Sequence, residues 1–220
     1  MTSTQRTLCT QCLRPQRTCI CTWIRPTEHD VEVLILQHPL EIDNAKGSAR
    51  LLHLSLPHSQ IMTGEVFVED ELRELLYAPL PHQDGKTQNK KTFQPLLLYP
   101  STSEDGNIVI PPVFMHPADH LAVQYRLVVL DGTWRKSRKM LYLNPLLQQL
   151  PRLPLSDPPA SHYRIRKAHK QDQLSTYEAT CYALMQLENE TEKYLPLLTA
   201  FDGFVDQISS YDPNLKENEI

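Results

Sequence analysis

Short apolar runs along the chain predict buried strands. The runs end at polar residues or at proline, as strands in the interior of a sheet commonly do. The predicted strands cover residues 31–37, 95–101 and 127–130, and residues 150–155 predict a further strand or extended edge.

Apolar residues that recur three and four positions apart predict helices between these strands. The predicted helices cover residues 45–54, 69–77 and 174–187, and another helix begins at residue 134. The polar stretches 78–94 and 102–120 predict loops, and residues 201–220 are acidic and end in a polar tail. Strands that alternate with helices predict an α/β fold, a mostly parallel sheet with helices on both faces.

Length and composition fit one well-cored domain with a small appendage. The chain has 220 residues, of which 40% are hydrophobic. We expect an N-terminal cysteine-rich domain over residues 1–28 and an α/β domain over residues 29–220. No apolar run is long enough to span a membrane and the amino terminus lacks the apolar core of a signal peptide, so a cytoplasmic protein is expected. Dinucleotide, P-loop, Ser/His/Asp and H-E-x-x-H motifs are absent from the sequence.

The run from residue 126 to residue 140 is the best candidate for a functional site. A buried strand ends at Asp131-Gly132-Thr133, and Trp134 opens a basic helix. Ligands of α/β proteins bind at the carboxyl ends of strands, and Gly132 permits close approach of a ligand. Burial would raise the pKa of Asp131 and the neighbouring cations would lower it. A simpler interpretation is that Asp131 or Thr133 caps the helix.

The charges are segregated along the chain. The net charge is -4, yet residues 135–170 hold nine Lys or Arg and one acid, and residues 1–27 hold four Arg and no acid. Two basic segments in an acidic chain indicate a polyanionic partner. The alternative is a solvated helix face.

Four cysteines near the amino terminus predict a metal site. Cys9-x-x-Cys12 is followed by Cys19-x-Cys21, and four thiolates suit tetrahedral zinc. We expect a structural zinc knuckle that carries basic side chains such as Arg14 toward a nucleic acid. A disulfide or redox role is the alternative.

Two further segments place polar side chains at the ends of predicted elements. His38-Pro39-x-Glu41 follows the first strand, and His38 suits a ligand site and a turn equally well. Ser175-Thr176-x-Glu178 opens a helix, where it can bind an anion or form a capping box. Cys181, on the apolar face of that helix, is predicted to lie in the core.

Together these motifs resemble the DTW-domain family of tRNA-uridine aminocarboxypropyltransferases. The resemblance rests on Asp131-Gly132-Thr133-Trp134, the cysteine pairs, His38-Pro39-x-Glu41, Tyr99-Pro100 and Ser175-Thr176-x-Glu178-Ala179, and it covers roughly residues 9–200. It implies S-adenosylmethionine as donor, N3 of a tRNA uridine as acceptor and methylthioadenosine as by-product. It also implies a fold related to the SPOUT RNA methyltransferases, with a knot in the carboxy-terminal part.

The resemblance also implies roles for particular residues. The catalytic candidates are Asp131 as base or orienter, Thr133 and Trp134. The expected donor-binding residues are Tyr99, Pro100, Leu130, Asp131, Gly132, Leu155, Ser175, Thr176 and Glu178, with Ser175 and Thr176 at the donor's carboxylate. The expected tRNA-binding residues are Arg135, Arg138, Lys139, Tyr163, Arg164, Arg166 and Lys167, and the zinc ligands are Cys9, Cys12, Cys19 and Cys21. RNA methyl transfer with the same donor, or a noncatalytic RNA-binding module, are the alternatives.

Overall fold

The computed structural model of the protein describes residues 7–79, 92–100, 114, 123–156, 159, 161 and 174–211. Its centre is a five-stranded sheet in the order β2-β1-β4-β3-β5, and every neighbouring pair of these strands is parallel. The strands are β1 (Glu32–Gln37), β2 (Ser59–Thr63), β3 (Thr92–Leu98), β4 (Val123–Asp131) and β5 (Arg152–Leu153).

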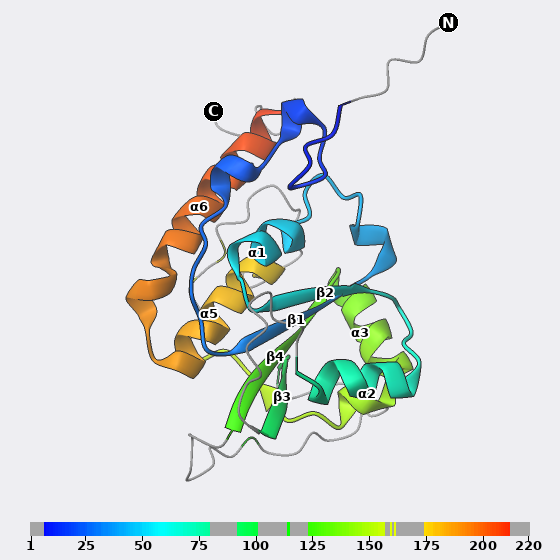
Figure 1. Ribbon diagram of the computed structural model, residues 1–220. Helices are drawn as coiled ribbons and strands as arrows, with labels where there is room; N and C mark the ends of the chain where they lie inside the picture. Colours follow the sequence, from blue (N-terminus) through cyan, green and yellow to red (C-terminus); the bar gives the residue numbers. More distant parts are fainter. Residues whose placement is uncertain are drawn as a thin grey trace, which may run out of the picture.

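Helices cover both faces of this sheet (Figure 1). One core cluster joins the sheet to α1, α5 and α6, and a second cluster joins it to α2, α3 and α4. The helices are α1 (Ala49–Ser55), α2 (Glu69–Tyr77), α3 (Trp134–Leu143), α4 (Pro145–Gln148), α5 (Thr176–Glu188) and α6 (Thr191–Ser210). Three short 3-10 helices span Gln16–Thr18, Cys21–Trp23 and Pro39–Glu41.

The central strands β1 and β4 are buried on both faces because each face packs against helices. Val33 and Ile35 of β1 belong to the first cluster, whereas Leu34 and Leu36 belong to the second. Strands buried on both sides therefore appear in the sequence as continuous apolar runs rather than as alternating ones.

A buried ion pair fixes how β1 and β4 align. Arg126 of β4 lies opposite Glu32 of β1, and its Nε donates a hydrogen bond to Glu32 Oε2 at 2.9 Å. In the same register Gln37 lies opposite Asp131, at the carboxyl end of both strands.

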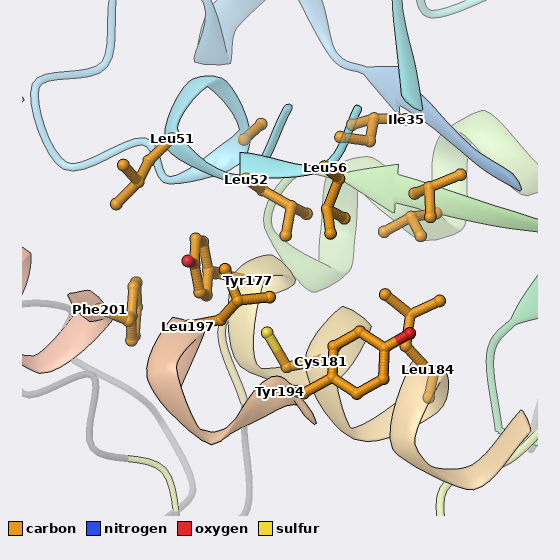
Figure 2. Packing of buried hydrophobic residues seen from close by; sticks show 14 of the residues in the cluster. Ile35, Leu51, Leu52, Leu56, Tyr177, Cys181, Leu184, Tyr194, Leu197 and Phe201 are labelled. Atoms are coloured by element: carbon orange, nitrogen blue, oxygen red, sulfur yellow. The ribbon is translucent and has the colours of Figure 1, made fainter. Parts of the chain in front are cut away.

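The first core cluster is built largely by α1, α5 and α6 (Figure 2). The ring of Tyr177 from α5 stacks on Phe201 from α6, with ring centroids 4.8 Å apart. Cys181 is fully buried in this cluster, and burial raises the pKa of its thiol. The prediction that Cys181 is a core residue is confirmed.

The N-terminal segment lies along α6, as the blue and orange-red ribbons of Figure 1 show. Cys12 and Ile20 are part of the first core cluster, and Gln207 Nε2 of α6 donates to the Cys19 carbonyl at 2.9 Å. The segment therefore shares a core with the α/β sheet, and the domain boundary at residue 28 stays a prediction.

Most of the predicted elements are confirmed, and three were missed. The α/β class, the parallel sheet and the helices α2, α3 and α5 agree with the sequence analysis. The elements without a sequence prediction are β2, α4 and most of α6. Residues 201–210, described from the sequence only as acidic, belong to α6, and the predicted loop 78–94 ends earlier because β3 begins at Thr92. Among the described helices, none combines the length and apolar character needed to cross a membrane.

Candidate functional site

Asp131 ends β4 with its carboxylate held by two neighbouring elements. Gln37 Nε2, from the end of β1, donates to Asp131 Oδ2 at 2.9 Å. Thr176 Oγ1, from the first turn of α5, donates to Asp131 Oδ1 at 2.7 Å. Asp131 is 6% exposed. The aspartate-glycine turn and the start of α5, which are 45 residues apart in the sequence, therefore meet at one point.

The start of α5 is a capping box. The Ser175 hydroxyl accepts from Glu178 N at 3.1 Å, and Ser175 N donates to Glu178 Oε2 at 2.8 Å. The capping interpretation of these two residues is confirmed, and it leaves the hydroxyl of Thr176 directed at Asp131. A role for Glu178 in donor binding stays a prediction, since its buried carboxylate also accepts a hydrogen bond from Ser161 Oγ.

A small polar pocket lies against Asp131. Residues from the segment after β1 form one side of it, and the start of α5 forms another. Its lining residues are Glu41, Asn44, Lys46, Gly47, Ser48, Asp131, Ser175 and Thr176. Three of the residues predicted to bind the donor, Asp131, Ser175 and Thr176, thus share one pocket.

Glu41 is buried at this pocket with both of its carboxylate oxygens in use. Lys136 Nζ of α3 lies 2.8 Å from Glu41 Oε1, and Asn44 Nδ2 donates to Glu41 Oε2 at 2.7 Å. Lys136, one of the cations near Asp131 in the sequence, is therefore paired with Glu41.

His38 serves the turn that follows β1. Its Nδ1 accepts a hydrogen bond from Leu40 N at 3.1 Å, which places the ring proton on Nε2, 2.9 Å from Glu65 Oε1. Lys139 Nζ lies 2.8 Å from the other oxygen of Glu65. Hydrogen bonds from Lys139 and His38 lower the pKa of Glu65. The structural interpretation of His38 is the one that the geometry favours.

The turn between β4 and α3 is shaped by Gly132 and Thr133. The Thr133 hydroxyl accepts from Lys136 N at 3.4 Å and caps α3, as the simpler interpretation of this motif predicts. A Cβ on Gly132 would lie 3.1 Å from Lys136 Cβ, so the glycine gives room to this lysine. Trp134 begins α3 and stays 48% exposed, with its ring edge-on to Tyr99 at 5.5 Å.

Four other residues predicted to bind the donor lie at the neighbouring strand ends, outside the lining of this pocket. Tyr99 is buried, and the Arg152 guanidinium lies 5.1 Å from the centre of its ring. Pro100 O accepts from Arg152 Nη1 at 3.0 Å. Leu130 belongs to the second core cluster and Leu155 packs against the first. Their contact with a donor stays a prediction.

The predicted tRNA-binding residues of α3 are exposed. Arg135, Arg138 and Lys139 lie on the surface of this helix, although Lys139 also pairs with Glu65. The other four predicted residues, Tyr163, Arg164, Arg166 and Lys167, lie outside the described residues.

The four N-terminal cysteines are gathered into one cluster. Their sulfur atoms all lie within 4.8 Å of one another, with Cys9 and Cys21 3.6 Å apart and Cys12 and Cys19 3.7 Å apart. Tetrahedral zinc with Zn–S bonds of about 2.3 Å separates its ligands by roughly 3.8 Å. Hydrogen bonds from the backbone of Cys12 and Gln11 lower the pKa of the Cys9 thiol to about 6. All four cysteines are free of disulfide bonds, so the donor set fits a metal ion.

Comparison with known proteins places the chain in a family. The model of the DTW domain matches residues 6–209, and the chain therefore belongs to the DTW domain family. It is similar to the curated tRNA-uridine aminocarboxypropyltransferase 2 of Drosophila melanogaster, with 29% identity over 196 residues, which are 86% of this chain and 69% of that protein.

Two mammalian relatives carry the same name. The Mus musculus protein is 28% identical over 191 residues and the Macaca fascicularis protein is 29% identical over 192 residues. Each match covers 84% of this chain and 57% of the relative, so the chain spans little more than half the length of these two proteins. No solved structure matches the chain at a significant level.

Sequence reasoning missed several residues that form the site. Gln37 was assigned to a strand, although its position opposite Asp131 brings its amide to the carboxylate. Other missed lining residues are Asn44, Lys46, Gly47 and Ser48. The polar, glycine-bearing loop before α1 was the available signal, because such loops at strand ends are common parts of α/β sites.

Proposed function

We propose that the protein transfers the 3-amino-3-carboxypropyl group of S-adenosylmethionine to N3 of a tRNA uridine and releases methylthioadenosine. The names of the relatives support the reaction. The observation that carries the proposal is the Asp131 carboxylate, held by Gln37 and Thr176 at the wall of a polar pocket.

The lining of the pocket suits the amino-acid end of the donor. Carboxylates from Glu41 and Asp131 and the cation of Lys46 lie around one small space. A zwitterion with an ammonium and a carboxylate group is complementary to such a mixed lining. In the proposed complex the methionine arm lies beside this space with its γ-carbon, rather than the donor's methyl group, toward Asp131, because orientation decides which group is transferred.

In the proposed reaction Asp131 accepts or orients the N3 proton of the uridine imide. The N3 electron pair then forms a bond to the γ-carbon as the bond between that carbon and the sulfonium breaks. The bonding electrons return to sulfur, which leaves as a neutral thioether, and the proton passes from Asp131 to solvent. Gln37 and Thr176 keep the carboxylate in place during these steps.

The acceptor would approach from the side of α3. Arg135, Arg138 and Lys139 offer exposed cations for phosphates, and the half-exposed Trp134 beside Tyr99 offers an aromatic surface near a base. Further phosphate contacts are proposed for Arg164, Arg166 and Lys167.

Three finer expectations belong to the same proposal. We infer that the all-parallel sheet is related to the SPOUT methyltransferases and is knotted in its carboxy-terminal part, as the family resemblance implies. The four cysteines would hold a structural zinc ion, which crosslinks the N-terminal turn when bound. A cytoplasmic location, where tRNA and the donor both occur, accords with the function.

The test is a product analysis with Asp131→Asn. We expect loss of product by about a hundredfold or more, the scale of general base catalysis, with tRNA affinity changed little because the substitution keeps the shape of the side chain. Purified protein is incubated with tRNA and labelled S-adenosylmethionine, and nucleosides and by-products are measured by mass spectrometry. Asp70→Asn, an exposed aspartate on α2, is the matched control.

Each other outcome points to a different conclusion. Full turnover by Asp131→Asn would remove Asp131 from the mechanism. Release of S-adenosylhomocysteine instead of methylthioadenosine would identify a methyltransferase. Binding of tRNA without consumption of the donor would identify a noncatalytic RNA-binding protein.

A further inference from the structure

Arg14 comes directly out of the cysteine cluster. It follows Cys12 by two residues, and Cys9 N donates to the Arg14 carbonyl at 2.8 Å. Leu13, between Cys12 and Arg14, adopts the left-handed conformation with φ 62°, and its N donates to the Cys9 carbonyl at 2.9 Å. The backbone of Arg14 is thus fixed by the same tight turn that presents two of the four sulfur atoms.

The Arg14 side chain reaches toward the loop before α1. Its Nη1 donates to the Ala45 carbonyl at 2.7 Å and its Nη2 donates to the Gly47 carbonyl at 2.8 Å. Its Cζ lies 5.5 Å from the centre of the Phe204 ring of α6. The guanidinium is thus bound within the protein, and the expectation that the knuckle carries Arg14 toward a nucleic acid stays a prediction.

The loop that Arg14 holds is a wall of the pocket. Gly47 N donates to the Asn44 carbonyl at 2.8 Å, and Lys46 N donates to Asn44 Oδ1 at 3.0 Å. Asn44, Lys46, Gly47 and Ser48 all line the pocket beside Asp131. Arg14 bonds two carbonyls within this compact turn, so its position and the position of the pocket wall are linked.

We propose that Arg14 is a positioning residue through which the cysteine cluster sets the shape of the pocket. The four cysteines would hold a metal ion, which would rigidify the turn that carries Arg14. Arg14 in turn positions residues 44–48, the loop that would bind the amino-acid end of the donor. The identity of that ligand rests on the proposed function, whereas the link between cluster and loop does not.

The chemistry of arginine explains why this link is specific. The planar guanidinium reaches two carbonyl oxygens at once, whereas the lysine ammonium is a point charge on a flexible stem. Arg50 Nη2 of α1 also donates to the Gln11 carbonyl of the cysteine turn at 2.8 Å. Hydrogen bonds therefore run in both directions, from Arg14 to the loop before α1 and from Arg50 of α1 to the cysteine turn.

The experiment compares zinc-loaded wild type, Arg14→Ala, Arg14→Lys and Arg17→Ala, each before and after chelation. Arg17 lies exposed on the same knuckle and is the matched control. The affinity for S-adenosylmethionine is measured by calorimetry, and amide hydrogen exchange of residues 44–48 is measured without ligand. Zinc content and circular dichroism verify that each sample is loaded and folded.

We expect Arg14→Ala to weaken donor affinity by about tenfold, within the usual range of coupling between two sites. It should keep its zinc and speed exchange at residues 44–48, Arg14→Lys should be intermediate, and Arg17→Ala should match wild type. Chelation should weaken the donor affinity of wild type by a similar factor and that of Arg14→Ala by little more, because the link is already broken.

Unchanged exchange at residues 44–48 in zinc-loaded Arg14→Ala would overturn the proposal, as would equal losses on chelation in wild type and Arg14→Ala. If wild type does not bind the donor, the proposed donor is wrong, and the exchange measurement still decides the role of Arg14. If Arg14→Ala does not fold, Arg14→Lys decides it by the same measurement.

Discussion

At the scale of single residues, the orientation of Asp131 depends on strand register. Gln37 lies opposite Asp131 because β1 and β4 run parallel and in step from Glu32 onward. Thr176 reaches the other carboxylate oxygen because the capping box fixes the first turn of α5. A shift of β1 by one residue would turn Gln37 to the other face of the sheet. The register is therefore what brings the Gln37 amide to the Asp131 carboxylate.

Removing the hydrogen bond that Gln37 or Thr176 donates to Asp131 should reduce turnover more than it reduces the affinity for S-adenosylmethionine. We expect Gln37→Leu and Thr176→Val each to lower kcat by about tenfold, since small misplacements of a catalytic group can reduce rates by up to about a hundredfold. Thr176→Ser, which keeps the hydroxyl, should restore most of the rate. Steady-state kinetics separates kcat from KM, and Thr63→Val, an exposed threonine at the same end of the sheet, is the control. A rate loss in Thr176→Ser equal to that in Thr176→Val would argue against positioning by the hydroxyl.

At the scale of elements, α6 holds the N-terminal segment through a close contact at Gly203. A Cβ placed on Gly203 would lie 2.1 Å from Cζ3 of the Trp23 ring. The same ring donates from Nε1 to Gln207 Oε1 at 2.5 Å. Glycine inside a helix is normally unfavourable by about 0.5–1 kcal/mol relative to alanine, so its presence here is explained by the close packing of Trp23.

Gly203→Ala should therefore destabilise the protein although alanine favours helices. We expect a loss of about 1–3 kcal/mol in the free energy of unfolding, the usual effect of overpacking, measured by urea denaturation. Trp23→Leu removes the ring, so in that background Gly203→Ala should have little effect or a slightly stabilising one. Equal destabilisation in both backgrounds would show that the contact with Trp23 is not the cause.

The elements that were predicted from the sequence have complete apolar patterns within their own residues, whereas the elements that were missed do not. The helix α2 and the strand β1 carry complete patterns, and their bounds agree closely with prediction. Pro196 and Gly203 interrupt the pattern of α6, which forms because Phe201, Phe204 and other apolar residues pack against α5 and the cysteine turn. Tertiary packing overrode local propensity there.

The part of the site that local sequence patterns mark was predictable, and the part that depends on tertiary contacts was not. Asp131, Ser175 and Thr176 stand at recognisable element ends, and they share the pocket. Gln37 and the link through Arg14 depend on strand order and on contacts between distant segments, which no local pattern contains.

At the scale of the whole molecule, Glu188 joins three elements at the end opposite the site. Its Oε1 accepts from Asp30 N at 2.8 Å and Val31 N at 3.0 Å, just before β1. Its Oε2 accepts from Lys193 Nζ at 2.7 Å and Tyr194 OH at 2.5 Å in α6. Burial acts to raise the pKa of Glu188, but these hydrogen bonds outweigh it and lower the pKa below its ordinary value of 4.5.

Because the pKa of Glu188 is lowered in the folded protein, the free energy of unfolding depends on pH. Its contribution is complete above the unfolded-state pKa of 4.5 and is lost as the pH falls through the lower folded-state pKa. We expect Glu188→Gln to reduce the free energy of unfolding by about 2 kcal/mol at neutral pH, and the difference from wild type to shrink in acid. Urea denaturation across the pH range measures this, with the exposed Glu190→Gln as control. A difference that does not change with pH would contradict the assignment.

The contact between α6 and the cysteine turn also bears on how the chain is made. Cys19 and Gln207 are 188 positions apart, yet they are hydrogen-bonded partners. During synthesis the cysteines leave the ribosome long before α6 exists, and domains generally fold only once their packing partners have emerged. The four thiols must therefore stay reduced in the nascent chain while the surface of α6, against which their turn packs, has not yet been made.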